Sequence, residues 1–183
     1  MRDVQLFDHV FGVGCHSIRI EGHFVHGSAH VARRPVAVIG SWDAATLGGA
    51  LALAVSRALL AVVAEDAQAS TPPRPIVFIA DTKGQELSRR EELLGLNGCF
   101  AHVARCVDLA RRRGHVTVTV IHSQAVSGGF LAFGMLADRV CALPGTRVGV
   151  MDLRAMSRIT KIPLERLEVL AATSPVFAPG AEN

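Results

Sequence analysis

The sequence predicts an α/β protein with a largely parallel β-sheet. Short apolar runs, such as 74–81 and 115–123, alternate along the chain with long segments whose apolar residues recur at helical spacing. The centres of these two runs, Val-Phe-Ile-Ala and Val-Thr-Val-Thr-Val-Ile, are rich in β-branched residues and almost continuously apolar, as expected for strands covered on both faces. A chain that alternates strand, helix and strand in this way favours parallel strands joined by right-handed crossovers.

Length and composition favour one domain spanning residues 1–183, with a sizeable core. Half of the residues are hydrophobic, and the mean hydropathy is +0.34, so much apolar surface must be buried or face a partner. The net charge is only +3, and the Lys and Arg residues are spread along the chain, which argues against a nucleic-acid-binding surface.

Strands are expected, in order, at residues 16–27, 34–42, 74–81, 115–123, 138–143 and, more weakly, 147–151. Helices are expected at 43–66, 88–113, 127–138 and 163–173. Asp43 is a suitable N-cap for the first helix, and Pro163 suits the first turn of the last. Apolar residues at intervals of three and four give the second helix a continuous stripe, formed by Leu93, Leu96, Phe100, Val103, Val107 and Ala110.

The apolar segment 44–64 is long enough to suggest a membrane span. Arg57 lies near its centre, at a cost of about 2.5–3.5 kcal/mol for membrane insertion. We therefore predict an amphipathic helix that is buried within the protein or at a subunit interface, and no membrane association. The first residues lack the apolar core of a signal peptide, and the four cysteines lack CxxC spacing, which together favour free, buried thiols and a cytoplasmic location.

Three histidines, His23, His26 and His30, are close enough in sequence to consider as metal ligands. In a strand His23 and His26 would point to opposite faces, which is poor ligand geometry, so no metal site is expected.

A candidate site begins at Ser127-Gly128-Gly129, where the strand at 115–123 gives way to a helix. The first N–H groups of a helix are unpaired and lie at the positive end of its dipole, and glycine lets a ligand approach the backbone. Such a turn can hold a developing negative charge, although close helix packing through small residues would use the same sequence.

A second turn, Thr82–Gln85, follows the strand at 74–81. If the two strands are parallel neighbours, both turns lie at the carboxyl edge of the sheet, where α/β proteins bind ligands. Two converging N–H donors at that edge would suit the enolate of a thioester.

Residues 80–143 resemble the carboxyltransferase branch of the crotonase-like superfamily, and within it the gamma subunit family of biotin-independent malonate decarboxylase. Three segments carry the resemblance: SRREELLG (88–95), SGGFLAFG (127–134) and VGVMDLRAMSRIT (148–160), with SPVFAPGAEN (174–183) as a further match. The resemblance implies a crotonase-like spiral of ββα units. One departure is HSQAVSGG, because generic carboxyltransferases often have Gly-Glu-Gly-Gly before their Ser-Gly-Gly.

The resemblance also implies a function. Together with a homologous beta subunit, the chain would decarboxylate malonyl-S-acyl carrier protein to acetyl-S-acyl carrier protein and CO₂, and it would be active only with that partner. The substrate would arrive on the phosphopantetheine-type arm of an acyl carrier protein subunit, and this subunit would bind no cofactor of its own.

Loss of CO₂ leaves an enolate oxygen, for which we expect the amides of Gly128 and Gly129 as donors. Ser127 would cap the helix or orient the ligand. The turn residues Thr82, Lys83, Gly84 and Gln85 are candidates for binding the substrate, although Lys83 and Gln85 could equally be exposed turn residues.

Two other functions stay open. A Clp-like serine hydrolase would use Ser127 as its nucleophile, but no histidine follows His122, so Lys161 would have to act as the base. A non-catalytic scaffold subunit of a carboxyltransferase complex would fit the high apolar fraction equally well.

Overall fold

The computed structural model describes residues 3–149, 151 and 153–173. The strands are β1 His16–Glu21, β2 Phe24–Val31, β3 Arg34–Ser41, β4 Ala45–Leu47, β5 Ile76–Gln85, β6 Thr117–Val126, β7 Arg139–Ala142 and β8 Arg147–Gly149. The helices are α1 Asp3–Phe11, α2 Gly49–Ala67, α3 Arg89–Leu93, α4 Leu96–Arg112, α5 Ser127–Phe133, α6 Leu153–Thr160 and α7 Leu164–Ala171.

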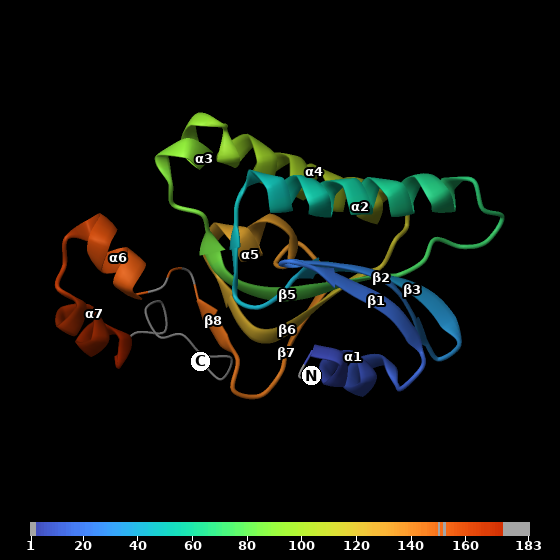
Figure 1. Ribbon diagram of the computed structural model, residues 1–183, viewed down its shortest axis with the longest axis horizontal. Helices are drawn as coiled ribbons and strands as arrows, with labels where there is room; N and C mark the ends of the chain where they lie inside the picture. Colours follow the sequence, from blue (N-terminus) through green and yellow to red (C-terminus); the bar gives the residue numbers. More distant parts are fainter. Residues whose placement is uncertain (1–2, 150, 152, 174–183) are drawn as a thin grey trace.

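The described strands form one mixed sheet in the order β1-β2-β3-β5-β6-β7, with β4 paired to β5 and β8 paired to β6. Strands β1, β2 and β3 are antiparallel, and the other pairings are parallel, which confirms the largely parallel sheet. Helices α2 and α4 lie on one face of the sheet and α1 on the other, while α6 and α7 stand beyond one end (Figure 1).

The main core lies between the sheet and helices α2 and α4. Val55, Leu59 and Val107 are completely buried from the helix side, and Phe78 meets Phe133 edge-on at a ring-centroid distance of 5.8 Å. A smaller core beneath α1 contains Phe7, Trp42 and Ile79. Fully burying each such side chain contributes about 1.5–3 kcal/mol, so the two faces together hold the sheet in place.

The first long helix differs from its prediction at its start. Residues 45–47 pair with the end of β5 as strand β4, and helix α2 begins only at Gly49 with Gly48 as its N-cap. Asp43 instead lies in a turn with φ 57°, so its prediction as an N-cap was wrong. Arg57 is exposed on α2, and no helix in the described ranges is long and apolar enough to cross a membrane.

The expected helix over 88–113 is two helices. Gly95, with φ 76°, ends α3 and precedes α4, and Leu93 is consequently 77% exposed instead of joining the apolar stripe. The rest of the stripe is confirmed within α4, because Val103, Val107 and Ala110 are buried.

Other boundaries also shift. The expected strand 16–27 is the β1–β2 hairpin, turning at Gly22 with φ 61°. The helix expected over 127–138 ends at Phe133, and helices α1 and α6 were not predicted. The prediction of buried thiols holds for Cys106 but was wrong for Cys15 and Cys141, which are exposed on a turn and on the edge strand β7.

His23 lies in the hairpin turn rather than in a strand, and its ring Nδ1 is 2.9 Å from the Trp42 carbonyl oxygen. Among the described residues, no group of three His, Cys, Asp or Glu side chains is placed to hold a metal ion.

Asp138, directly before β7, ties the start of that strand to the start of β6. The Thr117 N–H donates to Asp138 Oδ2 at 2.9 Å, and the Thr117 hydroxyl and the Arg111 guanidinium add further bonds. The Thr117 backbone hydrogen bond, followed by the Thr117 hydroxyl and Arg111, holds the pKa of Asp138 below its ordinary value.

Replacing Asp138 with Ala should lower the free energy of unfolding at pH 7 by about 1–3 kcal/mol, because the buried Thr117 amide loses its acceptor. The stabilisation from a lowered carboxyl pKa is present above the unfolded value of about 3.9 and is lost as pH falls through the folded value. Urea unfolding should therefore show the difference shrinking below about pH 4. Asp108→Ala, which breaks the exposed Arg112 pair, is the control and should cost about 0.5 kcal/mol or less at pH 7.

Candidate functional site

The end of β5 is shaped by a buried hydroxyl. Thr82 Oγ1 donates to the Ala45 carbonyl at 2.7 Å and accepts from the Gly84 N–H at 3.0 Å. Gly84 has φ 116°, a conformation that favours glycine, and this lets the chain bend immediately after Lys83. Thr82 is completely buried, so the structure places it beneath the turn, where it positions Gly84.

Ser127 lies at the junction between β6 and α5 with φ 63°, in the left-handed region that costs a non-glycine residue about 1–2 kcal/mol. Its hydroxyl donates to Gln85 Oε1 at 3.4 Å, a long hydrogen bond. A Cβ built on Gly84 would lie 3.0 Å from Ser127 Cβ. The two turns expected at the carboxyl edge are therefore in direct contact.

Gly128 and Gly129 are covered by neighbouring side chains. Gly128 is half-buried, and the Gln85 side-chain oxygen lies in the space that a Cβ of Gly128 would occupy. Gly129 is buried, and a Cβ there would lie 3.2 Å from Thr82 Oγ1 and 3.3 Å from Leu47 Cβ. Gly129 thus packs tightly beneath the turn, while the Gln85 side chain covers Gly128 and the Phe100 ring lies 3.6 Å from its Cβ position.

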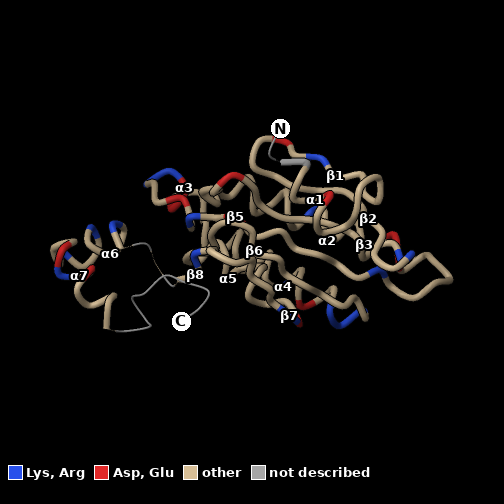
Figure 2. Tube along the Cα trace, turned by 90° about the horizontal axis from the view of Figure 1, so that it is seen from below, with Lys and Arg blue, Asp and Glu red and all other residues tan. Residues whose placement is uncertain are grey.

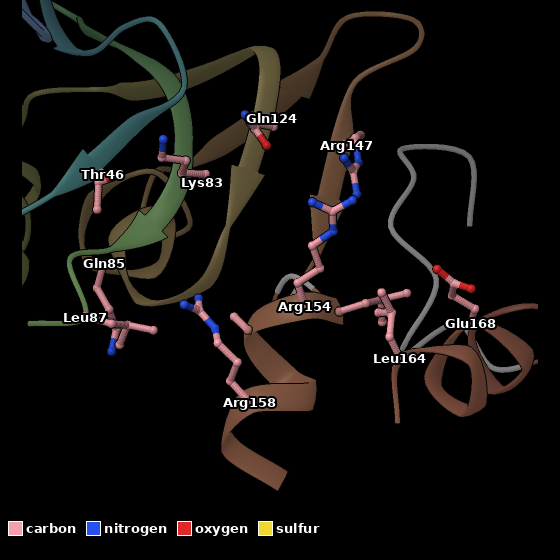
Figure 3. Close-up of a pocket in the computed structure, with 12 residues that line it drawn as sticks. Thr46, Lys83, Gln85, Leu87, Gln124, Arg147, Arg154, Arg158, Leu164 and Glu168 are labelled. Carbon is pink, nitrogen blue, oxygen red and sulfur yellow. The ribbon is translucent and has the colours of Figure 1, made fainter. Parts of the chain in front are cut away.

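Two cavities open beside these turns. A small one, of about 50 Å³, is lined by Gly84, Gln85 and Ser127 together with residues of α6. A larger one, of about 760 Å³, extends from Lys83 and Gln85 past Gln124 to the side chains of β8, α6 and α7 (Figure 3). Neither Gly128 nor Gly129 lines either cavity.

Behind the larger cavity, a carboxyl group is buried on the α1 side of the sheet. Asp81 is 3% exposed, and its Oδ1 has no hydrogen-bond partner in the described part of the chain. Its Oδ2 lies 3.7 Å from His122 Nδ1, too far for a hydrogen bond, and the His122 ring stacks on Trp42 at a centroid distance of 4.8 Å. Lys83 lies two residues after Asp81 on β5, and Gln124 lies two residues after His122 on β6. Both residues line the cavity.

The structure therefore brings Lys83, Gly84, Gln85 and Ser127 together around the two cavities, with Gly128 directly beneath Gln85. Sequence reasoning missed a cluster of arginines on β8 and α6, at positions 147, 154 and 158, that lines the larger cavity. The spacing of Arg154 and Arg158 on one helical face was the available signal.

The fold of the sheet and the glycine turns at its carboxyl edge define a structural class. The transcarboxylase 12S structure matches the chain with a TM-score of 0.71 and 17% identity, over 91% of this chain and 34% of the other, and it establishes the fold. The mixed sheet, with its two glycine turns meeting at the carboxyl edge, has the crotonase fold.

The chain belongs to the malonate decarboxylase gamma subunit family, whose sequence profile matches residues 44–183. It resembles the Pseudomonas malonate decarboxylase hetero-tetramer solved in complex with coenzyme A, with a TM-score of 0.83 and 27% identity, over 99% of this chain and 73% of the other. It is also 38% identical over 124 residues to the malonyl-S-ACP:biotin-protein carboxyltransferase of Malonomonas rubra. That match covers 66% of this chain and 42% of the relative, so the chain spans less than half the length of that protein.

Replacing His122 with Ala should destabilise the protein by about 1–3 kcal/mol, because the change leaves the buried Asp81 carboxyl without its facing ring and removes the Trp42 stack. Adding Asp81→Asn should then recover part of the loss, since a neutral amide is less costly to bury than an unpaired carboxylate. A double-mutant cycle by urea denaturation measures this coupling, and additive effects would contradict it.

Proposed function

We propose that the chain acts with a homologous beta subunit to decarboxylate malonyl-S-acyl carrier protein, giving acetyl-S-acyl carrier protein and CO₂. One observation carries the proposal: the Gly84 turn and the Ser127–Gly128 turn meet at the carboxyl edge of two parallel strands, beside a cavity. Family membership supports the chemistry, and the hetero-tetrameric Pseudomonas relative supports a partner subunit.

Decarboxylation of a malonyl thioester breaks the bond between the carboxylate and the α-carbon, and the electron pair moves onto the thioester oxygen as an enolate. Uptake of a proton from solvent at the α-carbon then gives the acetyl thioester. The thioester is itself the electron sink, so in this proposal the subunit binds no cofactor. Backbone N–H groups at the start of α5 have no partner one turn earlier in the helix and lie at the positive end of its dipole, so they suit that oxygen.

Gln85 covers the candidate donor. Its side-chain carbonyl oxygen occupies the space that a Cβ of Gly128 would fill, so an oxygen atom fits against this glycine. Rotation of Gln85 into the cavity that it lines would admit a thioester oxygen in its place. We therefore assign Gly128 as the principal donor, Gly129 as its packed support and Gln85 as the residue that the substrate displaces.

The other site residues have supporting parts. Thr82 and Gly84 fix the shape of the β5 turn, and Lys83 lines the larger cavity. The expected capping role of Ser127 was wrong, because α5 has no side-chain cap and the Ser127 hydroxyl bonds to Gln85 instead. We infer that residues 1–183 contribute these groups as a single domain and that the beta subunit completes the site.

Replacing Gly128 with Val should lower kcat for CO₂ release by about 10²–10³, the usual cost of losing one oxyanion donor, because the side chain fills the space that the substrate oxygen needs. The complex with the beta subunit is assayed with malonyl-carrier protein, alongside each subunit alone, and size-exclusion chromatography checks assembly. Gly98→Val is the matched control, because Gly98 lies exposed on α4 with no atom within 4 Å of its Cβ position. Unchanged activity in an assembled Gly128→Val complex would favour the scaffold interpretation.

A serine hydrolase is a second candidate, because a strained serine between a strand and a helix is the geometry of many nucleophiles. The Ser127 hydroxyl donates to the Gln85 amide oxygen. Among the described residues, it makes no hydrogen bond to a histidine or a lysine. We expect a radiolabelled fluorophosphonate to leave Ser127 unmodified in the assembled complex. Labelling that disappears in Ser127→Ala would support the hydrolase instead.

A further inference from the structure

The larger cavity concentrates positive charge. Among the described residues that line it, Lys83 comes from β5, Arg147 from β8, and Arg154 and Arg158 from α6, and the one acidic side chain is Glu168 from α7 (Figure 3). Basic side chains therefore outnumber acidic ones around the described part of the cavity wall. Elsewhere Lys and Arg lie scattered among acidic residues (Figure 2).

Three of these cations, Lys83, Arg147 and Arg158, differ in their pairing from arginines elsewhere in the described part of the chain. Arg74 bonds to Glu65 and Asp66, Arg111 to Asp138, and Arg112 to Asp108. In contrast, the side chains of Lys83, Arg147 and Arg158 have no ion pair or hydrogen bond to any described residue. Like charges gathered around a cavity repel one another unless an anion enters.

The charged cavity continues into the small cavity at the reacting turns. Lys83, Gln85, Leu87 and Ala155 line both cavities, and only the small one reaches Ser127. One depression therefore runs from the Ser127 turn to the arginines of β8 and α6. A ligand that fills it places one end beside Gln85 and Ser127, where rotation of Gln85 would open the way to Gly128, and the other end among guanidinium groups.

We propose that this arginine end binds the phosphate of a pantetheine arm, an inference that rests on the proposed function. In a malonyl-pantetheine thioester, the thioester and its carboxylate lie at one end and the phosphate at the other, which matches the polarity of the depression. Guanidinium groups bind phosphate oxygens through paired, charge-assisted hydrogen bonds, whereas the reacting end offers neutral amides. The phosphate therefore anchors the arm while the thioester reaches Gly128.

Isothermal titration of the assembled complex with 4′-phosphopantetheine and with pantetheine isolates the phosphate contribution. We expect the phosphorylated compound to bind about tenfold more tightly or better at low salt, with the preference falling as ionic strength rises. Arg147→Ala and Arg158→Ala should each remove most of this preference. Arg57→Ala, an exposed arginine on α2, is the control and should retain it.

Competition identifies the source of the phosphate. Displacement of 4′-phosphopantetheine by holo-carrier protein assigns the site to the carrier arm, and displacement by coenzyme A assigns it to the free coenzyme. Both results support a phosphate site. Displacement by malonate at equal concentration would instead assign the arginines to the substrate carboxylates and overturn the proposal.

Equal affinity for the two pantetheine compounds would also overturn it, as would loss of the preference in Arg57→Ala. CO₂ release is measured separately on the same samples. A complex that releases CO₂ but shows no phosphate preference refutes the phosphate site and leaves the function standing. A complex that prefers the phosphorylated compound but releases no CO₂ refutes the proposed decarboxylation and leaves the phosphate site standing.

Discussion

The parallel pairing of β5 with β6 is the constraint on which the site depends. Its register, from Ile76 opposite Thr117 to Thr82 opposite Ala125, brings two turns far apart in sequence to one edge of the sheet. Both strands are buried between α2 and α4 on one face and the α1 core on the other, so neither can slide without exposing apolar side chains. The position of Gly84 against Ser127 is thus set by the core rather than by the loops.

A buried hydroxyl and a strained backbone fix the detailed shape of the two turns that the core brings together. The Thr82 hydroxyl links β4 to the Gly84 turn, and the strained backbone of Ser127 is held between a buried strand and a helix whose Phe130 and Phe133 are also buried. Strain of this kind persists only where the surrounding packing determines it. Glycine at 84 and 128 permits close packing of the two turns, and the Gln85 side-chain oxygen lies in the space that a Cβ of Gly128 would fill.

The charged side chains fall into two groups, those paired locally and those around the larger cavity. Most acidic and basic groups near the core pair locally, as Arg74 does with Asp66, and so stabilise the fold. The cations around the larger cavity come from β5, β8 and α6, which are far apart in sequence but line one cavity. Unlike Arg74, the side chains of Lys83, Arg147 and Arg158 make no ion pair with a described residue, so their positions are not explained by local pairing.

The sequence by itself determined the alternation of strands and helices, the parallel order and the edge where the glycine turns lie, because hydrophobic period and turn residues are local properties of the chain. It did not determine that Ala45–Leu47 would pair with β5, that Gly95 would divide a helix, or that Gly129 would be packed closed. Nor could it place His122 opposite Asp81 or Arg147 near Arg158. Those facts depend on contacts between residues distant in sequence, which only the packed tertiary structure decides.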